Sequence, residues 1–151
     1  MEINTLKNNE LVTGISILAV LKHAQNVEIS KCMLIEPILS YTKVLQLLCR
    51  ANSSIKSIED LIIKESMVFA NFNERYREKL SLSINAIILF EKMGLLSIKN
   101  NAVIFIENNF NFNDSTLGKK TTARILASKN LANILMKGDS SDFYLSLRVE
   151  V

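Results

Sequence analysis

Residues 94–106 contain the local pattern that most restricts how this chain can fold. Gly94 ends an apolar segment, and two β-prone runs, residues 95–98 and residues 102–106, follow it. The polar residues 99–101 (KNN) separate the two runs. Because asparagine tolerates the left-handed backbone that a tight turn requires, the pattern predicts a β-hairpin with its turn at residues 99–101.

The segment from Ser81 to Lys92 directly precedes this hairpin and has the apolar spacing of a helix. Its apolar residues nearly enclose it, so we expect a central helix that ends before Gly94. A helix that runs straight into a hairpin is the arrangement of winged-helix domains. Other small α+β domains can contain one such step for reasons of packing, and that alternative stays open.

Apolar residues at three- and four-residue spacing predict further helices over residues 10–24 and 121–136. Pro37 lies inside a strongly apolar stretch and should divide it into a short helix ending near Ile35 and a second helix over residues 40–50.

Start signals and polar runs complete the expected element order. Ser57 and the acidic residues after it predict a short helix through Ile63. Residues 69–77 have no clean period and are interpreted as a loop that leads into or wraps a helix. The Asn-rich, turn-prone residues 107–118 are interpreted as a connecting loop. The tail predicts a helix capped by Ser140 or Ser141, and its last residues could equally finish as a strand.

Length and composition favour one folded domain. The chain has 151 residues, of which 48% are hydrophobic and 22% charged, so it is not a disordered, collagen-like or disulfide-scaffold protein. We expect a flexible lead-in over residues 1–9, followed by one mainly α, winged-helix-like domain over residues 10–151 with a C-terminal helical extension. The apolar run from Leu11 to Leu21 is shorter than the ~20 residues that span a bilayer, so no membrane association is predicted.

Candidate catalytic residues are scarce, because the chain has one histidine, two cysteines and four glycines. Cys32 and Cys49 lack CxxC spacing, which predicts structural thiols in a reduced, cytoplasmic setting. His23 follows an apolar helix, where a capping or surface histidine is expected. The sequence therefore predicts a non-enzymatic protein without a metal or a cofactor.

Two sets of residues are candidates for binding other molecules. Aromatic residues in polar stretches are typical of partner-binding anchors, with packing over the core as the alternative; they are Phe69, Phe72, Tyr76, Phe110, Phe112, Phe143 and Tyr144. Basic residues could contact the phosphates of a DNA backbone, with an exposed solvated face as the alternative; they are Lys99, Lys119, Lys120, Arg124 and Lys129. The net charge of +3 is too small to indicate an autonomous DNA-binding protein.

Four segments, taken in order, resemble a known family. They are NNELVTGISILAVLKHA, CMLIEPILSY, LSLSINAIILFEKMGLLSIKNNAVIFI, and ARILASKNLANILM followed by DFYLSLRVEV. In its pattern of apolar residues and in the order of its elements, the chain resembles the middle component of bacterial ABC-three-component systems. The Lamassu-type defence systems are members of this class. The family pattern suggests a Leu-Gly-Val-like turn near the end, where this chain has Leu147, Arg148 and Val149.

The resemblance implies a winged-helix-like adaptor between an SMC-related ABC ATPase and an effector, often a nuclease, in an anti-phage or anti-plasmid module that senses foreign DNA. The adaptor would restrain the effector until DNA is engaged, and it would meet DNA through the complex more than alone. The alternative function is a stand-alone winged-helix transcriptional regulator, with the helix at residues 81–92 as its DNA reader. That helix offers only Asn85 and Lys92 as polar readers, which favours the adaptor.

Overall fold

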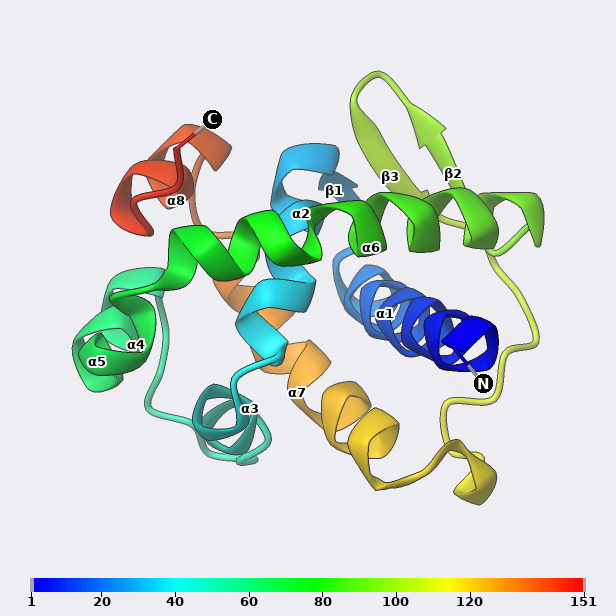
Figure 1. Cartoon of the computed structure of the whole chain (residues 1–151), viewed down its shortest axis with the longest axis horizontal. Helices are drawn as coiled ribbons and strands as arrows, with labels where there is room; N and C mark the ends of the chain where they lie inside the picture. The colour runs from blue at the N-terminus through cyan, green and yellow to red at the C-terminus, as the bar shows by residue number, and fades with distance from the viewer. Residues whose placement is uncertain (1, 151) are drawn as a thin grey trace.

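A computed structural model describes residues 2–150 of the chain, with side chains described from Asn9 onward. The protein is mainly helical with a small three-stranded antiparallel sheet, and it forms one compact domain (Figure 1). Helix α1 (Glu2–Ala24) contains the helix predicted over residues 10–24. It begins earlier than expected, because residues 2–9 of the predicted lead-in are helical, whereas Met1 lies outside the described residues.

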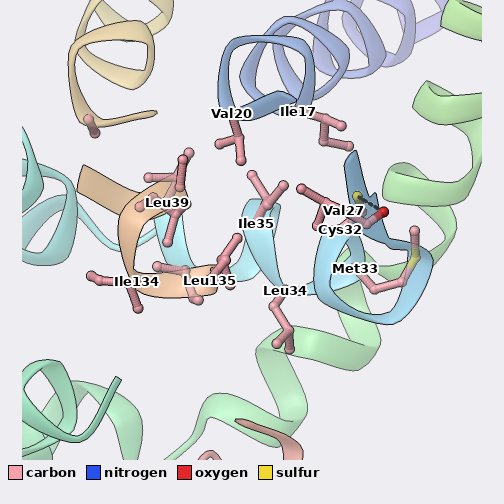
Figure 2. Close-up of a cluster of buried hydrophobic side chains, with 14 of the residues drawn as sticks. Ile17, Val20, Val27, Cys32, Met33, Leu34, Ile35, Leu39, Ile134 and Leu135 are labelled. Atoms are coloured by element: carbon pink, nitrogen blue, oxygen red, sulfur yellow. Dashed lines mark hydrogen bonds between the residues drawn. The ribbon is translucent and has the colours of Figure 1, made fainter. Parts of the chain in front are cut away.

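Helix α2 (Ile29–Leu39) lies at the centre of the molecule, the position that the sequence assigned to residues 81–92. Every residue of α2 from Cys32 to Leu39 is buried. Figure 2 shows its side chains gathered with those of α1, strand β1 (Asn26–Glu28) and helix α7 (Lys119–Leu135) in one apolar cluster. Burial on all sides explains why this helix has no polar face in the sequence.

Pro37 does not divide the helix at the place that the sequence predicted. Helix α2 continues through Pro37 to Leu39, and helix α3 (Thr42–Leu48) follows after a turn. The proline falls in the last turn, where its missing N–H removes a single hydrogen bond. Ser40 closes this turn, because its N–H donates to the Glu36 carbonyl at 2.9 Å and its hydroxyl donates to the Pro37 carbonyl at 2.8 Å.

The prediction of a loop over residues 69–77 is wrong. Helix α4 (Ile58–Lys64) begins as predicted, with the Ser57 hydroxyl accepting a hydrogen bond from the Asp60 N–H at 3.1 Å. Helix α5 (Ser66–Phe69) and helix α6 (Phe72–Lys92) then occupy the expected loop. Aromatic residues at positions 69, 72 and 76 follow helical spacing, and all three are buried.

Helix α6 lies across one side of the molecule and is not central (Figure 1). Its second half buries one face, which includes Ser83, Ile87 and Phe90, against α1 and α2. Ile84 and Ile88 are each 42% exposed, so the helix is not enclosed in apolar contacts. Helix α6 carries apolar residues on faces that it does not bury. Its sequence therefore predicted a more central position than the helix has.

The predicted hairpin is confirmed. Strands β2 (Leu96–Lys99) and β3 (Ala102–Phe105) pair antiparallel, with Lys99 opposite Ala102. Asn100 and Asn101 have φ values of 51° and 63°, the left-handed conformation that a type I′ turn needs at both positions. A strand that the sequence did not predict, β1 (Asn26–Glu28), pairs with β3 and gives the sheet order β1-β3-β2.

The last third of the chain follows the prediction closely. A loop with the short 3-10 helix η1 (Ser115–Leu117) leads to α7 (Lys119–Leu135) and α8 (Ser140–Ser146). The N-cap of α8 is Asp139, and residues 147–150 form no strand. Within residues 2–150, no helix combines the length and the apolar character needed to cross a bilayer.

Arg148 has a φ of 57°, in the left-handed region, at the position where the family pattern suggests glycine. A residue with a Cβ is strained there by about 1–2 kcal/mol, and glycine is not. We therefore expect Arg148→Gly to raise the free energy of unfolding by about 1 kcal/mol or less, because the added flexibility of the unfolded chain offsets part of the relief. Urea denaturation measures the change. Arg148→Ala retains the strain and should give no gain.

Candidate functional site

Four of the aromatic residues predicted to bind a partner are buried: Tyr76, which also lines a groove beside α8, and three that belong wholly to the core. Phe72 is fully buried, and Phe69 and Phe143 are 7% and 4% exposed. The rings of Phe69 and Phe72 lie 5.6 Å apart and pack beside Tyr41. These three side chains cannot serve as partner-binding anchors in this structure. The alternative, packing in the core, is the correct interpretation.

Phe110 and Phe112 also pack on the molecule. Their ring centroids lie 4.7 Å apart, and both half-buried side chains rest against the core. The ammonium group of Lys22 lies 4.8 Å from the centre of the Phe112 ring. This contact ties the loop at residues 107–118 to the end of α1.

Tyr76 and Tyr144 are brought together from distant parts of the chain. Their rings meet edge to face at 5.6 Å, and their hydroxyl oxygens lie 3.1 Å apart. The Tyr144 hydroxyl also donates to the Ser30 carbonyl at 2.7 Å. Burial and the neighbouring Tyr76 hydroxyl raise the pKa of Tyr144 far above its usual value, so it stays protonated as a donor. The pair fixes α8 to α2 and α6.

The two tyrosines line an open apolar groove beside α8. Helix α8 lies at the end of the molecule where α6 begins (Figure 1). The groove has a volume of about 800 Å³. It is lined by Ile29, Ser30, Met33, Tyr76, Ser140, Ser141, Tyr144, Leu145 and Val149. Leu145 is 77% exposed at its edge. A large apolar side chain beside an apolar groove forms a contiguous patch of the kind that binds other proteins. We call this surface the α8 groove.

The predicted DNA-contacting residues do not form one surface. Arg124 is 2% exposed and therefore cannot reach a DNA backbone. Lys99 lies in the hairpin, on the opposite side of the molecule from the start of α7, which carries Lys119 and Lys120 (Figure 1). Lys129 is exposed further along α7. Only α7 keeps a group of exposed lysines.

A buried polar cluster that was not predicted from the sequence lies among α1, α2 and α7. The Arg124 Nη1 atom lies 2.8 Å from both carboxylate oxygens of Glu36. Thr13 donates a hydrogen bond to Glu36, and Arg124 donates to the Ser16 hydroxyl at 3.3 Å. A signal was present, because Glu36 is a carboxylate inside the apolar run CMLIEPIL and such a charge must find a partner.

The thiols and the histidine occupy the positions that the sequence predicts. Burial raises the pKa of the Cys32 thiol to about 12, and its sulfur contacts the Val27 carbonyl (Figure 2). Burial also raises the pKa of Cys49, so neither thiol is activated as a nucleophile. His23 lies exposed in the last turn of α1, where partial burial and the charges of Lys22 and Lys129 lower its pKa. Within the described part of the chain, no three His, Cys, Asp or Glu side chains are grouped to hold a metal ion.

Comparison with family models, with curated proteins and with solved structures gives no match for this chain. The resemblance to the middle component of ABC-three-component systems therefore remains a prediction.

Proposed function

We propose that this protein is a non-enzymatic adaptor subunit of a bacterial defence complex, bridging an SMC-like ABC ATPase and an effector. The observation that carries the proposal is the α8 groove. Its lining is mostly apolar, its volume of about 800 Å³ falls within the range of binding sites, and Leu145 is 77% exposed beside it. Such a surface costs free energy in water unless a partner covers it.

We also propose that the domain is winged-helix-like, and the order of its elements supports this proposal. Helices α1, α2 and α6 precede the β2–β3 hairpin, and β1 joins its free side to complete the sheet. In this proposal the second half of α6 corresponds to the reading helix of a winged-helix protein, because it directly precedes the hairpin. Its exposed face carries Ile84 and Ile88, which are each 42% exposed, beside Asn85. Apolar side chains on this face favour contact with protein over contact with base edges.

We assign the α8 groove to an apolar helix of the ATPase. Helices α2, α6 and α8 contribute to the groove, and a partner helix can place its apolar stripe between them. Docking can restrain the effector only if the resting and DNA-engaged complexes differ in their free energy of binding to this subunit. The effector would contact another face, so that both partners bind at once.

We expect Leu145→Glu to abolish recovery of the ATPase when the tagged protein is purified from its native cells. A carboxylate at the edge of the groove would lose its hydration if an apolar helix covered it. The 77% exposure of Leu145 predicts little change in the stability of the adaptor itself. Mass spectrometry identifies the ATPase in the purified complex, and thermal denaturation checks the fold.

Leu126→Glu is the matched control, because Leu126 is 61% exposed on α7 and does not line the groove. This variant should recover as much ATPase as the wild type. Equal recovery with Leu145→Glu would remove the groove from the proposal. A sequence-specific gel shift by the isolated chain at ~150 mM salt, with no ATPase recovered, would favour the transcriptional regulator instead.

A further inference from the structure

We propose that a second cavity binds a small molecule through its phosphate group, with Arg75, Lys79 and Lys120 around the group and Arg124 beneath it. The cavity has a volume of about 300 Å³ and shares no lining residue with the α8 groove. Helices α2, α6 and α7 supply its charged side chains. This inference does not depend on the adaptor function.

The charge of the lining favours an anion. Glu36 is the one carboxylate among the lining residues, and it is already paired with Arg124 at 2.8 Å. The cations Arg75, Lys79 and Lys120 remain in excess. Among residues 9–150, none of these three forms an ion pair. A partly enclosed cavity with cations on its walls concentrates positive potential at its centre.

Arg124 lines the cavity, and its hydrogen bonds to Glu36 and Ser16 leave one of its donors unpaired. The residue is 2% exposed and lines the cavity, yet its Nε–H has no hydrogen-bond partner within the described part of the chain. Native proteins rarely leave a buried charged donor unsatisfied, because its lost hydration is not replaced. Among the described residues, Oε2 of Glu36 is buried without a hydrogen-bond partner as well, so it is the unpaired cations Arg75, Lys79 and Lys120 on the cavity wall that favour an anion here.

Arg75 is already positioned at the cavity wall. Its guanidinium stacks 4.3 Å from the centre of the Tyr41 ring, and its Nη1 donates to the Ser40 hydroxyl at 3.4 Å. A guanidinium that is fixed in advance loses less conformational entropy when it binds a phosphate. Its remaining N–H groups suit the tetrahedral array of phosphate oxygens.

Depth and size point to a small molecule instead of a nucleic-acid backbone. A cavity of about 300 Å³ is at the lower end of the range for ligand sites. Arg124 lies too deep for the phosphates of a duplex to approach it. Leu39, Leu45 and Leu82 add apolar lining that an organic substituent could cover. Inorganic phosphate and a phosphomonoester share the required chemistry.

The test is calorimetric titration of the full chain with inorganic phosphate, adenosine 5′-monophosphate and adenosine, at one ionic strength held with chloride. We expect both phosphates to bind and adenosine not to bind. Lys79→Met/Lys120→Met should raise Kd by about tenfold or more, because two charge-assisted contacts are lost. Lys129→Met, on the same helix as Lys120 but outside the cavity, should keep the wild-type Kd.

The outcomes separate the two sources of phosphate. Tighter binding of the monophosphate assigns the site to a phosphomonoester, and equal binding assigns it to free phosphate. Absence of binding by both phosphates would overturn the proposal. So would adenosine binding as tightly as its monophosphate, or an equal loss of affinity in Lys129→Met. Thermal denaturation confirms that each variant is folded before it is titrated.

Discussion

Replacement of Glu36 by leucine is expected to lower the free energy of unfolding by about 3–5 kcal/mol. The variant leaves the Arg124 guanidinium 2% exposed, without the carboxylate that lies 2.8 Å from it. A buried charge without a counter-charge loses its hydration and gains nothing in return. Urea denaturation in phosphate-free buffer measures the loss without stabilisation by a bound anion.

The double variant Glu36→Leu/Arg124→Met is the matched control. It removes both charges and keeps apolar groups of similar size, so it should lose clearly less stability than Glu36→Leu alone. Equal losses in the single and double variants would show that the cost comes from packing and not from the unpaired charge.

Gly14→Ala is expected to destabilise the protein by about 1–3 kcal/mol, the usual cost of overpacking a core. A Cβ at position 14 would lie 2.2 Å from Cε1 of Phe90 and 2.5 Å from its Cζ. Phe90 is 1% exposed, so its ring has no free space into which to move. In an exposed helix the same change would stabilise by about 1 kcal/mol, so the sign of the effect reports the contact between α1 and α6.

Phe90→Leu provides the background in which this interpretation is tested. The leucine removes the ring atoms that the new methyl group would meet, although it costs stability by itself. Gly14→Ala should therefore cost less in the Phe90→Leu background than in the wild type, as measured by a double-mutant cycle in urea. Additive effects of the two changes would contradict the steric explanation.

The elements that the sequence predicted correctly have signals that are local. The hairpin followed from two asparagines between β-prone runs, and α7 followed from an uninterrupted apolar period. Strand β1 was missed because its three residues carry no pattern and its partner β3 is distant in sequence. The start of α6 was missed because polar residues between Phe72 and Tyr76 conceal the helical spacing of the aromatic side chains.

The binding surfaces were predictable only in part, since each depends on contacts between distant segments. Tyr76 and Tyr144 were identified as candidates, but only the folded chain places them together in the α8 groove. Arg124 was identified as a basic residue of a helix, and its inward direction follows from Glu36 on α2. Arg124 alone does not predict the pair. Glu36, as an isolated carboxylate in an apolar run, is the one signal that indicates a buried partner.

The pairing of β1 with β3 affects the order in which this molecule can assemble. The β2–β3 hairpin closes over two residues and can form within microseconds, whereas Val27 must find Val103 across about half of the chain. That encounter requires α1, α2 and α6 to be in place first, because the entropy of closing so long a loop must be offset by their packing. We therefore expect the third strand to form late in folding, after the β2–β3 hairpin, and a chain that ends before residue 103 would leave the edge of β1 unpaired.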